Sequence, residues 1–173
     1  ASTAYSIFRQ GDEDVAVLPQ IANAKDVLAI TEVMASNGET IATANGKKGL
    51  DWIELHNTAP FAIDLTGWYL SDNPDKKPAK WKKIEGDGMI ASGEYKVVWA
   101  DKNYGDLAEG EARTPTGLGA SGDPLFLADP RTTKISDAIV LMDSYGKAIK
   151  DVSTGFGDGS LVYYREPTPG APN

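Results

Sequence analysis

The seven residues D-W-I-E-L-H-N, at positions 51–57, give the clearest indication of the fold class of this chain. Along them, Ile53 and Leu55 alternate with Trp52 and Glu54. Successive side chains of a β-strand point to opposite faces, so this alternation is typical of a strand that is buried on one face. The stretch therefore predicts a half-buried β-strand whose two aliphatic side chains point toward a core.

Short apolar stretches of the same kind lie on both sides of this strand, separated by glycine, proline and polar residues. The chain has 18 glycines and 10 prolines in 173 residues, and no long stretch has the 3.6-residue period of a helix. This pattern is typical of an antiparallel all-β domain. The expected strands are 27–34, 51–57, 63–70, 80–84, 94–100, 124–128, 138–142, 148–152 and 161–165.

The segments between these strands are predicted to be turns and loops. Gly67 is expected to allow a bend or a bulge inside its strand. The turn at 143–146 should join 148–152 to the preceding strand as a hairpin. The polar stretch 101–117 is predicted to be a loop, and the glycine-rich stretch 155–159 is predicted to be a turn or a bulge.

Residues 1–26 are predicted to be an N-terminal extension of a single domain at 27–173. Pro19 interrupts any long helix in this extension, because proline lacks the backbone N–H that a helix interior needs. Two alternatives remain for its local structure. One is a strand near Asp14–Leu18, and the other is a short helix near Ile21–Val27.

The composition narrows the classes of partner. The formal net charge is −8, from 17 Lys and Arg against 25 Asp and Glu. A polyanion needs a basic surface, so this charge argues against nucleic acid as a partner. The lack of cysteine excludes disulfides and thiolate ligands. The sequence contains no run of about 18 apolar residues, so no membrane-spanning helix is predicted. Because the chain starts at Ala1 rather than Met, we expect it to be a processed or trimmed form.

Six stretches, in order along the chain, point to a known family. They are L-A-I-T-E-V-M at 28–34, D-W-I-E-L-H-N at 51–57, I-D-L-T-G-W-Y-L-S-D at 63–72, I-A-S-G-E-Y-K-V-V-W-A-D at 90–101, G-L-G-A-S-G-D at 117–123 and Y-R-E-P-T-P-G-A-P-N at 164–173. In this order and spacing they resemble lamin-tail domains. The resemblance covers 27–173 and implies an immunoglobulin-like antiparallel β-sandwich. Only 129–138 departs from the family pattern, and we interpret it as an insertion or an added strand.

The resemblance also implies a biological context. In animals such domains belong to intermediate-filament proteins, whereas in bacteria they are attached to secreted or surface proteins. No coiled-coil heptads precede the domain, which favours the bacterial form and an extracellular or cell-envelope location. We therefore expect a non-catalytic binding, adhesion or assembly module whose partner is a protein or a cell-surface polysaccharide. The alternatives are a carbohydrate-binding module and an accessory domain of a calcium-dependent hydrolase.

Few residues could carry catalysis. His56 is the single histidine, so neither a histidine-rich zinc site nor most acid–base designs can be built, and we expect no enzyme. Glu32 and Glu54 are the most informative carboxylates, since both fall in expected strands. A pair of carboxylates across a cleft could hydrolyse a glycoside. We instead expect a structural role, in which each carboxylate accepts hydrogen bonds from loop backbone N–H groups.

Asp72, Asn73 and Asp75 lie close together in one predicted turn. Carboxylate and amide oxygens are the ligands that Ca²⁺ prefers, so these three residues are weak candidates for a calcium site. The same residue types are common in turns without any metal. No other cofactor is expected.

The aromatic and basic residues complete the candidate sites. Trp68 and Trp99 share strand faces with aliphatic residues and are predicted to be structural core residues. Trp81 lies between lysines and is expected to be exposed, and Tyr163 and Tyr164 point to opposite faces; Trp81 and Tyr164 are the weak binding candidates. The densest basic cluster is interpreted as a solvated face rather than a binding site. Its members are Lys76, Lys77, Lys80, Lys82 and Lys83.

Overall fold

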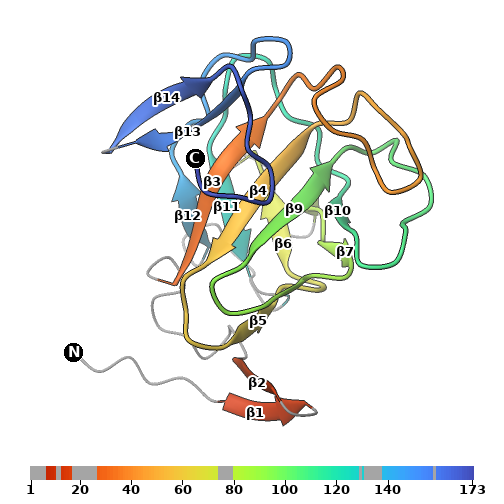
Figure 1. Cartoon of the computed structure of the whole chain (residues 1–173), viewed down its shortest axis with the longest axis vertical. Helices are drawn as coiled ribbons and strands as arrows, with labels where there is room; N and C mark the ends of the chain where they lie inside the picture. The colour runs from red at the N-terminus through yellow and green to blue at the C-terminus, as the bar shows by residue number, and fades with distance from the viewer. Residues whose placement is uncertain are drawn as a thin grey trace.

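The computed structural model describes residues 7–10, 13–16, 27–73, 80–128, 130, 138–157 and 159–173. Within these residues the chain forms β-strands and no α-helix (Figure 1). The strands are β1 (Ile7–Gln10), β2 (Glu13–Ala16), β3 (Leu28–Met34), β4 (Trp52–Asn57), β5 (Ala62–Asp64), β6 (Tyr69–Ser71), β7 (Glu85–Gly86), β8 (Met89–Ile90), β9 (Tyr95–Ala100), β10 (Ala112–Thr114), β11 (Leu125–Ala128), β12 (Ile139–Met142), β13 (Ser153–Gly157) and β14 (Ser160–Tyr164). No helix in this part of the chain has the length and apolar character of a membrane span.

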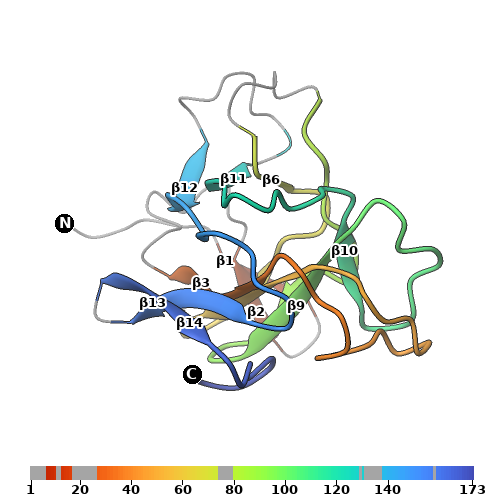
Figure 2. The ribbon, with the colours of Figure 1, turned by 90° about the horizontal axis from the view of Figure 1, so that it is seen from above.

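Two layers of strands pack face to face. The larger layer is a seven-stranded sheet in the order β14-β13-β3-β4-β9-β10-β7, with β4 at its centre. A three-stranded sheet, β12-β11-β6, lies across from it, and Figure 2 shows the two as separate layers. The predicted immunoglobulin-like β-sandwich is therefore confirmed. Most neighbours are antiparallel, but β9 and β10 pair in parallel, as do β2 and β5.

The main core lies between the layers. Ile53 and Leu55 point into it and are fully buried, as their alternation predicted. Trp68 and Leu70 belong to the same cluster. Burying a large aliphatic side chain contributes roughly 1.5–3 kcal/mol, so the aliphatic face of β4 is a major source of stability.

A second cluster covers the outer face of the large sheet. Trp52 and Trp99 are directly opposite each other on β4 and β9, and both are buried. Met34, Leu50 and Tyr104 complete the cluster. The strand predicted to be half-buried is thus buried on both faces, because the chain after β3 and the chain after β9 bring Leu50 and Tyr104 onto the second face.

Two predicted strands in the first half of the domain are corrected. The stretch 63–70 is divided into β5 and β6, and Gly67, at φ 81°, provides the expected bend between them. The expected strand 80–84 is not a ladder. It is held to β6 by a single bridge between Tyr69 and Lys83 and by backbone hydrogen bonds on either side of it.

Two predictions in the second half were wrong, and a third was right only in part. The expected loop 101–117 contains β10, which pairs with β9. The expected hairpin strand 148–152 makes only one bridge, Ile149 to Val152, because β12 pairs with β11 instead. The turn predicted at 155–159 is confirmed at Gly159, between β13 and β14, whereas 155–157 belong to β13. Gly155 crosses β3 so closely that a Cβ there would lie 2.2 Å from Thr31 O.

The N-terminal residues contribute a further sheet, β1-β2-β5-β8. The strand expected near Asp14–Leu18 is present as β2, one residue earlier than its predicted start. The alternative helix near Ile21–Val27 lies outside the described residues except for its last residue, and most of 129–138 lies outside them too.

Candidate functional site

The two carboxylates singled out by sequence lie side by side in the large sheet. Glu32 on β3 is directly opposite Glu54 on β4, next to a bulge in β3. Glu54 lies between Ile53 and Leu55 along its strand, so it points to the opposite face from the main core. Both glutamates are nonetheless fully buried, with 0% exposure.

The C-terminal segment, residues 167–173, accounts for their burial. In Figure 1 this segment crosses in front of β3 and β4. The backbone N–H of Gly170 donates to Glu54 Oε2, and that of Thr168 lies 3.2 Å from Glu32 Oε2. Within the sheet, Thr31 Oγ1 donates to Glu54 Oε1 at 2.6 Å and the Ser153 hydroxyl donates to Glu32. The pair therefore fastens the end of the chain to the sandwich.

Burial raises the pKa of Glu54, and the neighbouring charge of Glu32 raises it further. The hydrogen bonds from Thr31 and Gly170 act in the opposite direction. A buried carboxylate is tolerated only when donors replace its lost water, and these donors do so. Both carboxylate oxygens of Glu54 therefore accept hydrogen bonds from groups of the chain itself.

Two further carboxylates hold loops in place, and no local pattern predicts either of them. Asp151, at φ 56°, accepts the N–H of Gly38 at 2.6 Å and that of Glu39 at 2.9 Å. Glu111 accepts the N–H of Ala44 at 2.7 Å and the hydroxyl of Tyr104. The contacts to Gly38, Glu39 and Ala44 join segments 67 or more positions apart, which no local pattern reveals.

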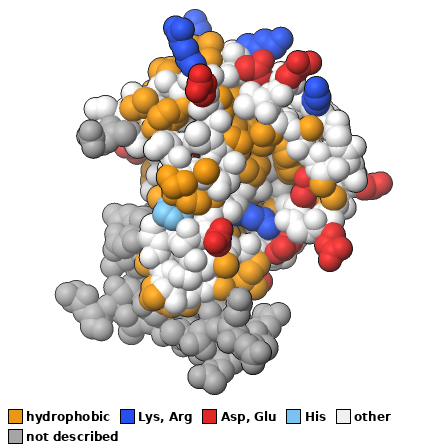
Figure 3. All heavy atoms as spheres, in the orientation of Figure 1, with side chains coloured by type: hydrophobic (Ala, Val, Ile, Leu, Met, Phe, Trp, Pro, Cys, Tyr) orange, Lys and Arg blue, Asp and Glu red, His pale blue; other side chains and the backbone are white. Residues whose placement is uncertain are grey.

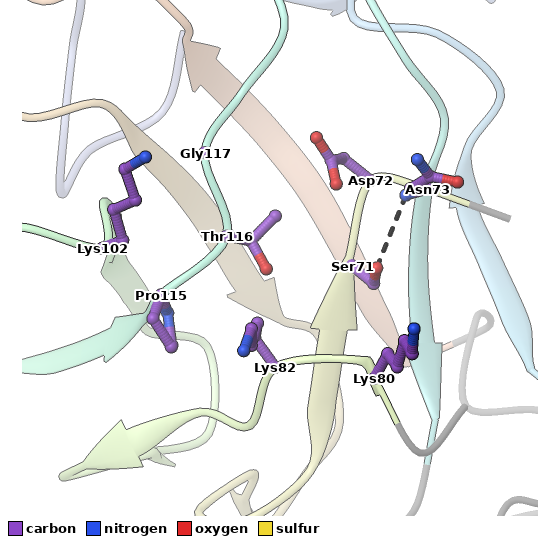
Figure 4. A pocket seen from close by; sticks show the side chains of 9 residues that line it. All are labelled: Ser71, Asp72, Asn73, Lys80, Lys82, Lys102, Pro115, Thr116 and Gly117. Atoms are coloured by element: carbon purple, nitrogen blue, oxygen red, sulfur yellow. Dashed lines mark hydrogen bonds between the residues drawn. The ribbon is translucent and has the colours of Figure 1, made fainter. Parts of the chain in front are cut away.

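A polar pocket of about 340 Å³ opens where the end of β6 meets the segment after β10 (Figure 4). Lysine, hydroxyl and amide side chains dominate its lining. The lining residues are Ser71, Asp72, Asn73, Lys80, Lys82, Lys102, Pro115, Thr116 and Gly117. In the close-up, Lys102 lies on one side of the Pro115–Gly117 segment, and Lys80 lies with β6 on the other.

Trp81 positions two of these lysines and corrects a prediction. It is 5% exposed rather than open to solvent, and its ring meets Tyr69 edge-on at 6.2 Å. Lys80 and Lys82, which flank this buried tryptophan along the chain, both line the pocket. The prediction was wrong because the lysines on either side of Trp81 indicate only that they themselves are exposed. They say nothing about the exposure of the tryptophan between them.

Hydrogen bonds hold the floor of the pocket. Leu70 N donates to Lys82 O at 3.2 Å, which fastens the lysine segment to β6. Thr114 Oγ1 and Thr116 Oγ1 each lie 3.1 Å from Leu70 O and 3.1 Å from one another. Sequence analysis missed Lys102, Ser71 and Thr116, because three segments far apart in the chain meet here.

The candidate calcium residues divide between the pocket and a part of the chain outside the description. Asp72 and Asn73 line the pocket, and Asp75 lies outside the described residues. Within the described ranges, no three His, Cys, Asp or Glu side chains are grouped as a metal site requires. The neighbouring ammonium groups oppose a cation, and calcium at this turn stays a prediction.

The aromatic candidates lie mostly inside. Trp52, Trp68, Trp81 and Trp99 are all buried, so the tryptophans offer no exposed stacking row. Tyr163 is 41% exposed, whereas Tyr164, the candidate named from sequence, is only half-buried.

The surface carries no dominant charge on the face that Figure 3 shows. Acidic and basic side chains are interspersed there with apolar ones.

The single histidine makes a packing contact. The ring of His56 stacks on that of Tyr95, with 4.1 Å between the ring centroids and an interplanar angle of 2°. This contact uses the imidazole as a packing surface near the end of β4, against the first residue of β9.

Comparison with known proteins agrees with this architecture. The family model described as Lamin Tail Domain matches residues 21–156, from before β3 into β13. The curated proteins and the solved structures contain no match to the chain. The matched range includes strands of both layers and the lysine pocket, and it ends before β14. The chain belongs to the lamin tail domain family, whose fold is immunoglobulin-like.

Proposed function

We propose that this lamin tail domain is a non-catalytic interaction module of a secreted or cell-surface bacterial protein, and that it binds a cell-surface polysaccharide. The fold alone specifies no ligand, since sandwich domains serve many functions. The proposal therefore rests on what particular side chains do.

One observation carries it: the carboxylate pair best placed for hydrolysis is used to hold the chain together. The oxygens of Glu32 and Glu54 accept hydrogen bonds from Ser153, Thr168, Thr31 and Gly170. A general acid or nucleophile must reach a substrate, and these two are covered by the C-terminal segment. Their geometry supports a structural role.

The lysine pocket supports a saccharide rather than a protein as the partner. Its size of about 340 Å³ is at the lower end of small-molecule sites, which suits a sugar unit with its substituents. Its polar lining can orient hydroxyl or charged groups. A protein partner would need a broader contact, of roughly 800 Å² on each side.

The first experiment measures binding and turnover together. Purified protein is sedimented with insoluble bacterial cell-wall polysaccharide, and the same mixture is assayed for released sugars. We expect co-sedimentation without release of sugar. Failure to sediment, together with capture of a surface protein, would instead favour a protein partner.

The second experiment tests catalysis and location. Glu54→Gln should leave any background hydrolysis of chromogenic glycosides unchanged, whereas a loss of turnover would contradict the non-catalytic assignment. For location, antibody detection in fractions of the producing cell should find the protein in the envelope or medium. A signal confined to the cytoplasm would contradict that part of the proposal.

A further inference from the structure

We propose that the lysine pocket binds one anionic substituent, a phosphate, sulfate or carboxylate group, carried by the polysaccharide. This inference rests on the proposed function and adds the chemical class of the ligand. It also replaces the interpretation of Lys80 and Lys82 as a merely solvated face.

The residues that line the pocket carry a net positive charge. Three lysines face the pocket against one aspartate, Asp72, in a chain whose formal net charge is −8. Within the described residues, no hydrogen bond or ion pair involves the ammonium groups of Lys80, Lys82 or Lys102. The pocket is therefore a local positive site on an acidic protein, and an anion would pair ammonium groups that are otherwise left to water.

The second step is that the backbone beneath the lysines is fixed. Trp81 is buried between Lys80 and Lys82, and the segment is tied to β6 through Leu70 N and Lys82 O. Ile84 N donates to Trp68 O at 2.7 Å immediately afterwards. Because the stems of the lysines start from fixed positions, less conformational freedom is lost when an anion binds.

The third step is the neutral donor. Ser71 is 4% exposed and lines the pocket, and its Oγ accepts the N–H of Asn73 at 3.4 Å (Figure 4). That contact uses the oxygen and leaves the hydroxyl proton free to donate. By contrast, Thr116 is satisfied by Leu70 O and Thr114. Three ammonium groups and one hydroxyl donor match the acceptor oxygens of an oxyanion.

The negative net charge of the chain favours a ligand with a single anionic group over a polyanion. A nucleic acid or an anionic membrane would place many negative charges against an acidic surface. A single substituent meets only the pocket. The volume of about 340 Å³ leaves room for the group and the sugar that carries it.

The test is a backbone amide NMR titration of the 173-residue chain at constant ionic strength. The probes are inorganic phosphate, inorganic sulfate, glucose 6-phosphate, glucuronate and glucose. We expect saturable shifts at Ser71, Thr116 and Gly117 with the anionic probes and none with glucose. Comparison of glucuronate with the phosphates and sulfate shows which oxyanion the pocket prefers.

Charge-matched variants locate the site. The double variant Lys82→Gln/Lys102→Gln should weaken binding of glucose 6-phosphate by about tenfold or more, which is the scale of one lost charged contact. The control, Lys48→Gln/Lys147→Gln, removes the same charge from exposed lysines elsewhere and should leave binding unchanged. Lys102→Gln alone, an exposed loop change, provides a second variant if the double variant folds poorly.

The outcomes separate this inference from the proposed function. Polysaccharide binding that the pocket variant leaves intact would overturn the anion pocket and leave the interaction module standing. Equal binding of glucose and glucose 6-phosphate would overturn the role of charge. Pocket shifts with anions but no polysaccharide binding would support the site while contradicting its proposed partner.

Discussion

Replacing Glu54 by alanine tests the role of the buried carboxylate pair most directly. The change removes the acceptor for Thr31 Oγ1 and for the N–H of Gly170, two partly buried hydrogen bonds to a residue that is itself fully buried. A hydrogen bond to a charged group contributes about 1.5–3 kcal/mol net. Relief of the repulsion between Glu54 and Glu32 offsets part of this loss. We expect the free energy of unfolding to fall by about 1–3 kcal/mol.

The assay is urea unfolding followed by tryptophan fluorescence, with thermal melting as a second measure. A loss of about 2 kcal/mol should lower Tm by roughly 4–8 °C for a domain of this size. Glu109→Ala, which removes an exposed carboxylate, is the control and should change stability by less than about 0.5 kcal/mol. An unchanged Tm in Glu54→Ala would refute the structural role of Glu54.

A truncation that removes 167–173 tests how much of the stabilisation by Glu54 comes from its contact with the C-terminal segment. In the truncated chain Gly170 is gone, so Glu54→Ala should cost about 1 kcal/mol less than in the full chain. Amide hydrogen exchange at Gly170 should also speed up in the full-length variant. Equal costs in the two backgrounds would mean that Glu54 acts without the C-terminal segment.

Three further substitutions test other parts of the structure. Burial raises the pKa of Asp51 to about 6, so the charged carboxylate destabilises the fold above that pH, and this penalty disappears below about pH 3.8. Asp51→Asn should therefore raise the free energy of unfolding at pH 8 by about 1 kcal/mol, after allowance for solvent screening. At pH 3.5 it should change nothing, and urea titrations at the two pH values measure the difference. Trp81→Phe removes a buried indole N–H that has no acceptor among the described residues and should cost less than about 1.5 kcal/mol in urea; a larger loss would reveal a missed partner. Gly155→Ala forces a Cβ against Thr31 O and should destabilise by about 1–3 kcal/mol, whereas Gly117→Ala meets nothing within 4 Å, so equal melting curves would contradict the close crossing.

The lysine pocket shows why a site can escape sequence analysis even when its residues are noticed. Lys80 and Lys82 were visible as part of a basic cluster, but Lys102 lies 20 or more positions away. The three lysines meet only because the segment after β6 and the loop after β9 flank the same hollow. Trp81 was misjudged for the same reason, since its burial depends on Tyr69 across a bend in the chain.

Local sequence patterns were sufficient to establish the class of fold and the face of each main strand. The alternation of Ile53 and Leu55 with Trp52 and Glu54 is a local property, because side-chain direction in a strand follows from backbone geometry alone. Ordered motifs of the same local kind were enough to identify the lamin tail domain family. Residue types also set limits on chemistry, as one histidine and no cysteine show.

Strand pairing, and the segments that cover each strand, depend on contacts that form only in the folded chain. β10 is short and polar on its own, and it is a strand because β9 offers it a parallel partner. Glu32 and Glu54 are buried because the C-terminal segment, more than 100 positions away in sequence, supplies donors to them. Pairing and burial are properties of contacts between distant segments, and no local pattern records those contacts.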